Sequence, residues 1–196
     1  MAPIPALKEW AAICHALLEG EQIIDLRKGG LREDGRHFGV ATTHAWLYPT
    51  VEHQRGELLK PAYQHWIDLA HNAPVGTDIE LHGFVEIVEA IQISEPEQLG
   101  AITSKVIWSD SYAESRMQWK RRDPLWVLIL RAHQLVEPIT VTWSDDYKGC
   151  TSWVDFPSTL PDIATIASRP AISDAVFEAR VKGVREAIEQ ATAASG

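Results

Sequence analysis

The chain has 196 residues, of which 45% are hydrophobic and 23% are charged, and its formal net charge is −9. This length suits one domain with a sizeable core, and no apolar run approaches the roughly 20 residues that cross a bilayer. The acidic balance argues against indiscriminate binding to a polyanion, which favours a basic surface.

The N-terminal part of the sequence predicts a helix, a short strand and a cationic turn. Apolar residues at helical spacing predict the helix over about residues 5–18, and Gly20 stands where a helix would end. Residues 22–26 form the predicted strand, and the polar residues 31–41 predict a loop. The four residues that follow the strand are Arg27, Lys28, Gly29 and Gly30. Two cations beside two conformationally permissive residues suit either a phosphate-binding turn or a plain hairpin.

The middle of the chain predicts a short strand over residues 45–48 and a helix over residues 57–70. A long strand signal follows over residues 78–93, and the alternation of its apolar residues changes phase partway. We therefore expect a bulge near Gly83 or Val88.

The last third predicts a helix over residues 109–119 and strands over residues 126–136, 139–143 and 149–154. Ser173 then caps a C-terminal helix with an apolar docking stripe. Because helices and strands do not alternate regularly, we expect an α+β fold on a small curled sheet rather than parallel βαβ winding. The expected organisation is one domain over residues 1–196, with its core over about 5–156 and a helix over about 173–192 docked on it.

A second group of candidate ligand-binding residues lies in the strand at 45–48 and just after it. Its members are Trp46, Tyr48, Glu52, His53 and Gln54, and Lys60 and Tyr63 lie one helical turn apart just beyond it. Aromatic faces beside hydrogen-bonding side chains are what the recognition of unstacked bases uses. The alternative interpretation is a packed corner of the fold with a polar rim.

Complete catalytic and metal-binding motifs are absent from the sequence. The histidines lack the i, i+4 spacing of a helical HExxH pair, so neither a metal nor a cofactor is expected. Asp78 and Glu80 resemble part of a restriction-type nuclease motif, but His82 stands where that motif has lysine. A GxSxG serine motif is also missing.

Several long phrases resemble the bacterial domain-of-unknown-function 1802 family. They are LKEWAAICHALLEGEQIIDLRKGGLRE, LYPTVEHQRGELLKPAY, PLWVLILRAHQLVEP and SDAVFEARVKGVREAI. The family has no established activity. Its members are sometimes joined to restriction-type endonuclease domains, and this implies a role in restriction–modification or nucleic-acid defence.

The segment ALLEGEQIIDLR is also similar to the GxKxxExR signature of ASCH domains, which belong to the PUA-like β-barrels that bind RNA or modified bases. Gly20, Asp25 and Arg27 take signature positions, with Asp replacing Glu, and Gln22 stands at the lysine position. The resemblance implies a ligand between the barrel and the helix that precedes the signature. Arg27 and nearby aromatic residues would then line a cleft.

The leading functional hypothesis is a non-catalytic module that recognises nucleic acid or a modified base. In this hypothesis Arg27 and Lys28 contact phosphate or a base edge, and the aromatic side chains stack. The alternative is an enzyme acting on a nucleotide or small phosphorylated molecule, with His53 and Glu52 as acid and base. A third hypothesis is a subunit whose exposed tryptophans dock another protein. The expected partners are nucleic acid and a restriction-type nuclease, with no membrane, and the expected location is the cytoplasm.

Overall fold

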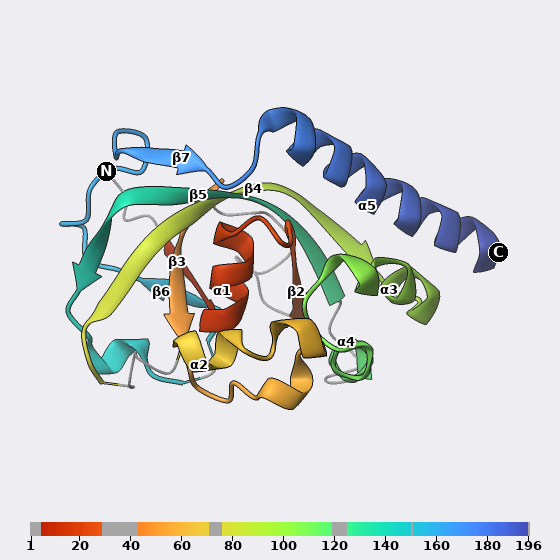
Figure 1. Ribbon diagram of the computed structural model, residues 1–196, viewed down its shortest axis with the longest axis horizontal. Helices are drawn as coiled ribbons and strands as arrows, with labels where there is room; N and C mark the ends of the chain where they lie inside the picture. Colours follow the sequence, from red (N-terminus) through yellow and green to blue (C-terminus); the bar gives the residue numbers. More distant parts are fainter. Residues whose placement is uncertain (1–4, 29–42, 71–75, 119–124, 150, 196) are drawn as a thin grey trace, which may run out of the picture.

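A curled sheet forms the centre of the protein (Figure 1). The computed structural model describes residues 5–28, 43–70, 76–118, 125–149 and 151–195. The strands in these ranges are β1 (Pro5–Trp10), β2 (Ile24–Lys28), β3 (His44–Thr50), β4 (Ile79–Ile93), β5 (Leu125–Val141), β6 (Trp153–Asp155) and β7 (Ser168–Pro170). Their order is β2-β5-β4-β3-β1-β6, and β7 pairs with β5. The described strands therefore make an open sheet whose two ends are β2 and β6.

The pairing is antiparallel except between β1 and β3, which run parallel from Ala6 beside Trp46 to Trp10 beside Thr50. The α+β class and the curled sheet predicted from the sequence are confirmed. The long β4–β5 ladder shifts register near Gly83 and near Val88, as the change of phase predicted. These irregularities accompany the bend of both strands over α1 (Figure 1).

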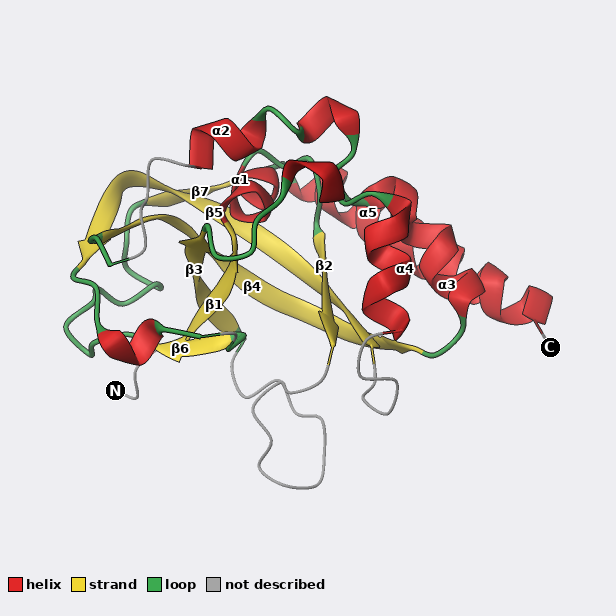
Figure 2. Cartoon of the chain, turned by 90° about the horizontal axis from the view of Figure 1, so that it is seen from below, coloured by secondary structure: helices red, strands yellow, loops and turns green. Residues whose placement is uncertain are grey.

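Short helices surround the sheet, and one of them lies inside its curl. They are α1 (Ala11–Leu18), α2 (Trp66–Ala70), α3 (Pro96–Ile102), α4 (Asp110–Gln118) and the longer α5 (Asp174–Ser195). Single 3₁₀ turns are η1 (Gly56–Leu58), η2 (Pro61–Tyr63), η3 (Thr103–Lys105) and η4 (Asp145–Tyr147). Figure 2 shows α3, α4 and α5 gathered at one side of the sheet. Within the described ranges, no helix has the length and apolar character that a membrane crossing requires.

Two apolar cores lie on the two faces of the sheet. Leu7 and Leu47 point into the larger core, which surrounds α1 and includes the docked face of α5. Ala6, Trp46 and Tyr48 point into a smaller core on the other face. This division follows from the strand geometry, because successive side chains point to opposite faces.

The predicted helix over residues 5–18 is wrong in its first part. Residues 5–10 form β1, and only residues 11–18 are helical. Leu7 fits the helical stripe of apolar residues but lies on a strand that β3 and β6 flank. Lys8 and Glu9 resemble a solvated helix face in the sequence, yet both are buried.

Other boundaries also differ from the sequence predictions. The segment expected as one helix over residues 57–70 is divided into η1, η2 and α2, and Pro61 starts η2. The two strands expected on either side of Pro138 are one strand, β5. Pro138 falls in the register shift between Gln134 and Ile139, where β4 needs no hydrogen bond from it. The predicted loop over residues 31–41 lies outside the described residues.

An ion network links β2, at one end of the sheet, to β1, the strand next to the other end. Arg27 Nε lies 2.6 Å from Asp25 Oδ2, and Arg27 Nη2 lies 2.6 Å from Glu9 Oε2. The same guanidinium donates to the Lys8 carbonyl at 3.2 Å and to Ser152 Oγ at 3.4 Å. Burial raises the pKa of the Glu9 carboxyl, and Arg27 acts in the opposite direction. Side chains therefore join β2 to β1 and to Ser152, just before β6, where the described strands have no shared ladder.

We predict that Arg27→Met destabilises the fold by about 3–5 kcal/mol, because it leaves two buried carboxylates without their cation. The matched control is Arg185→Met. Arg185 pairs with Glu89 at 2.7 Å on the surface, and its loss should cost no more than about 1 kcal/mol. Urea denaturation measures both free energies of unfolding, and equal losses would contradict a bridging role for Arg27.

Candidate ligand-binding site

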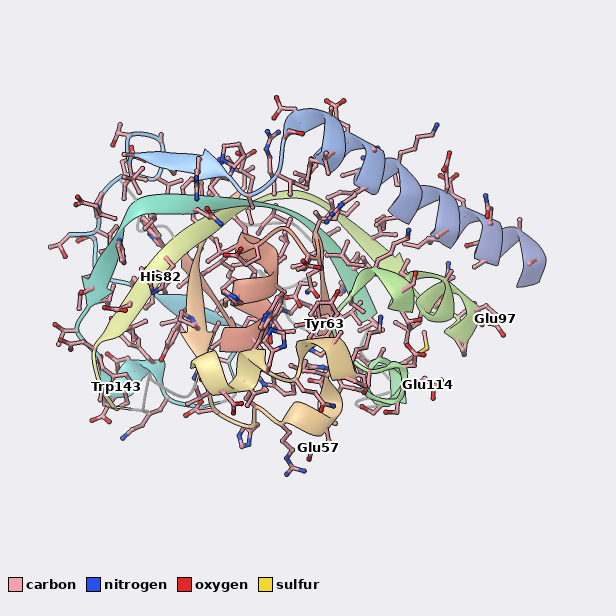
Figure 3. The ribbon with its side chains drawn as sticks, in the orientation of Figure 1. Glu57, Tyr63, His82, Glu97, Glu114 and Trp143 are labelled. Atoms are coloured by element: carbon pink, nitrogen blue, oxygen red, sulfur yellow. The ribbon has the colours of Figure 1, made fainter. Side chains whose placement is uncertain are left out.

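An open cleft of about 700 Å³ lies between α1 and the ends of β3, β4 and β5. His15 of α1 and Glu19, which follows this helix, line the cleft together with Tyr48 of β3. Trp143, just beyond β5, and His82 on β4 also line it, and Figure 3 shows both on the same side of the molecule. A space of this volume is the size of a small-molecule site.

A buried lysine fixes a carboxylate at the cleft wall. Lys8 Nζ lies 2.8 Å from Glu52 Oε2 and donates to the carbonyls of Tyr147 and Gly149, each at 2.9 Å. These three acceptors match the three protons of an ammonium group. Glu52 is also tied through its backbone N–H, which donates to Thr50 Oγ1 at 3.2 Å. The Glu52 carboxylate is therefore held in place while it stays partly open to the cleft.

Aromatic side chains form the wall around this carboxylate. The rings of Tyr48, Tyr147 and Phe156 meet at centroid distances of 5.3 to 6.2 Å. Burial raises the pKa of the Tyr48 hydroxyl, the charge of Glu52 adds to this shift, and a hydrogen bond with Trp143 opposes it. Tyr48 is thus a neutral hydrogen-bond donor at physiological pH.

Two contacts hold α1 in position beside the cleft. The Gln54 Oε1 atom accepts a hydrogen bond at 3.0 Å from the Ala12 N–H in the first turn of the helix. Gly83 of β4 allows the close approach of the other end, since a Cβ there would lie 2.3 Å from the Leu18 side chain and from the His133 carbonyl oxygen. Both contacts join α1 to other segments of the chain.

The structure brings two of the sequence-predicted site residues, Tyr48 and Glu52, to the cleft. Arg27 lies in the ion network, outside the described lining. Trp46 is buried in the smaller core, with its ring edge toward Phe84 at a centroid distance of 6.1 Å. These placements give Arg27 and Trp46 partners within the protein.

The remaining predicted residues also lie outside the lining of the cleft. His53 is exposed and has a positive φ of 61°. Lys28 Nζ donates to the Met117 carbonyl at 3.0 Å, and Lys60 Nζ donates to the carbonyls of Thr103 and Val106 at 2.6 and 2.8 Å. Tyr63 donates to Glu21 at 3.2 Å, and Gln54 holds α1 as described above. Gly29 and Gly30 are outside the described residues.

Sequence reasoning missed Lys8, Trp143, Tyr147 and Lys148. Lys8 is not recognisable in the sequence, because the spacing of the apolar residues predicts a helix over its segment. The other three belong to the motif WSDDYK, which places two aromatic residues and a cation directly after a strong strand signal. That pattern could have identified them. Among the described residues, no group of three His, Cys, Asp or Glu side chains could hold a metal ion.

The curled sheet with a helix in its concave side is an ASCH-like fold. A crystal structure of ASCH from Zymomonas mobilis matches with a TM-score of 0.50 and 14% sequence identity, over 80% of this chain and 89% of that one. Two mutant structures of the same protein match with TM-scores of 0.47 and 0.42 at 13% and 16% identity. They cover 80% and 70% of this chain and 91% and 73% of theirs.

Residues 6–183 match the family described as Domain of unknown function (DUF1802), and the chain belongs to this family. A comparison with curated proteins finds no match. Helix α1, which lines the cleft, is the helix that precedes the ASCH-like signature. The described signature residues Asp25 and Arg27, however, pair with each other in the ion network.

We predict that Lys8→Met destabilises the protein by about 1–3 kcal/mol, because it leaves Glu52 and two backbone carbonyls without their donor. Amide hydrogen exchange over residues 143–149 should rise, since two of the lost bonds end there. Lys182→Met removes only an exposed ion pair with Glu186 and serves as the control. Unchanged exchange in Lys8→Met would show that Lys8 does not order this segment.

Proposed function

We propose that this protein is a nucleic-acid recognition module that takes a single unstacked base or nucleoside into the cleft. The Tyr48 hydroxyl and the Glu52 carboxylate supply a donor and an acceptor for the polar edge of the base. Trp143 provides a face on which the ring stacks. The sugar and phosphates remain toward solvent.

The observation that carries this proposal is the lysine-held Glu52 beside an aromatic wall. Recognition of a flipped or single-stranded base needs stacking surfaces and hydrogen-bonding groups fixed in one small pocket. Glu52 meets the second requirement because Lys8 holds it before any ligand arrives. Trp143 meets the first, since its half-buried ring lines the same cleft.

The geometry favours binding over the catalytic alternative. That alternative needs His53 and Glu52 to act together on a bound substrate. Glu52 lines the cleft and is paired with Lys8, whereas His53 lies outside the described lining. The enzyme, the restriction-type nuclease partner and the cytoplasmic location stay predictions.

Titration of the four common nucleosides and of short single-stranded RNA and DNA, followed by tryptophan fluorescence, tests the proposal. We predict that Trp143→Ala weakens binding roughly 5- to 150-fold, which corresponds to about 1–3 kcal/mol for one stacked base. Tyr48→Phe should weaken binding by removing one hydrogen bond, whereas Tyr63→Phe should leave the affinity unchanged. Tyr63 is the matched control because its hydroxyl bonds Glu21 outside the cleft.

Thermal unfolding of each variant separates lost contacts from lost structure. Binding that survives both Trp143→Ala and Tyr48→Phe in folded protein would contradict the assignment of the base to this cleft. Turnover of a nucleotide that is lost on His53→Ala would favour the enzyme instead.

A further inference from the structure

The charged side chains around the cleft are mostly acidic. The lining contains four carboxylates and one lysine: Glu19, Glu52, Asp78, Glu80 and Lys148. Lys8 neutralises Glu52 from behind, and Lys148 pairs with Asp145. In the part of the chain that the structure describes, neither Glu19 nor Asp78 forms an ion pair. The cleft therefore presents negative charge to an incoming molecule.

This charge distribution disfavours a phosphate inside the cleft and favours a cation. A phosphate entering between α1 and β4 would approach Glu19 and Asp78, which carry charge of the same sign. A positively charged group would be attracted by both carboxylates. The base of a nucleic acid can carry such a charge only when its ring is alkylated or protonated.

The aromatic wall already binds a cation within the protein itself. Lys148 Nζ lies 5.1 Å from the centroid of the Trp143 ring, and Lys8 Nζ lies 5.5 Å from that of Tyr48. An indole face attracts a ligand cation by the same electrostatics. Lys148 is exposed and ends at the surface, so a ligand can displace it, whereas Lys8 is buried behind the wall.

From these observations we infer that the cleft selects a base whose ring is positively charged at neutral pH, such as 1-methyladenine or 3-methylcytosine in a nucleoside. This inference rests on the proposed function and specifies its ligand class. The cationic ring stacks on Trp143 in place of Lys148, and its positive charge faces the carboxylates of Glu19 and Asp78. The Tyr48 and Glu52 groups then contact its polar edge.

Pairs of methylated isomers give the sharpest test, because they differ in ring charge and not in composition. At pH 7 the rings of 1-methyladenosine and 3-methylcytidine are cationic, whereas N6-methyladenosine and 5-methylcytidine are neutral. We expect each cationic isomer to bind about 10-fold or more tightly than its neutral partner, with a preference that falls as salt rises. Isothermal titration calorimetry measures all four affinities on the full chain.

Variants of the charged residues test the mechanism. The double variant Glu19→Gln, Asp78→Asn should abolish most of the preference for the cationic isomers over the neutral ones. Lys148→Met should strengthen binding of the cationic isomers, because it removes a competing cation from Trp143. Lys182→Met is the control and should change neither, since Lys182 lies on α5 and pairs with Glu186.

Each failure has a distinct meaning. Equal or tighter binding of the neutral isomers would overturn the inference and leave base recognition intact. Binding of tetramethylammonium as tight as that of 1-methyladenosine would show a site for any organic cation and overturn the base assignment. If no nucleoside binds the folded protein, the proposed function fails together with the inference.

Discussion

The Arg27 guanidinium, held between Asp25 and Glu9, is the interaction on which the rest of the structure depends. The described strands leave the sheet open between its end strands β2 and β6, and Arg27 links β2 to β1, the neighbour of β6. An ion network does this where a backbone ladder is missing. It also joins β1 to the segment before β6, because Ser152 accepts from the same group. A buried cation with two carboxylates and additional hydrogen bonds satisfies the geometric conditions under which such a network holds its partners in place.

Strand β1 connects this network to the cleft. Glu9 and Lys8 are neighbours in sequence, so their side chains leave the strand on opposite faces. Glu9 meets Arg27 on the face of the larger core, and Lys8 meets Glu52 on the other face. Two adjacent charged residues therefore order two different parts of the molecule. The fold and the proposed binding site share a single strand, and we expect damage to β1 to affect both.

The class of fold and the bulges of β4 could be predicted from the sequence, because apolar periodicity reports which residues are buried and where the phase changes. The two buried charges could not be predicted, since Lys8 and Glu9 have the polarity of a helix surface until tertiary partners neutralise them. The prediction of the site residues met the same difficulty, because the sequence does not show which tertiary partners a charged side chain has. Tyr48 and Glu52, predicted at the end of a recognisable strand and just after it, both line the cleft. The sequence predicts Arg27 as a ligand contact and does not reveal that Asp25 and Glu9 are its partners within the protein.

The central claim is that a base enters the cleft and stacks at Trp143. Nuclear magnetic resonance of the indole N–H groups during titration with 1-methyladenosine tests this claim most directly. The account predicts saturable shifts of the Trp143 and Trp66 indole signals, because both residues line the cleft. The signals of Trp126 and Trp153, which pack against the larger core, should stay unchanged. Shifts confined to Trp126 and Trp153, or no shift at saturating ligand, would contradict the account.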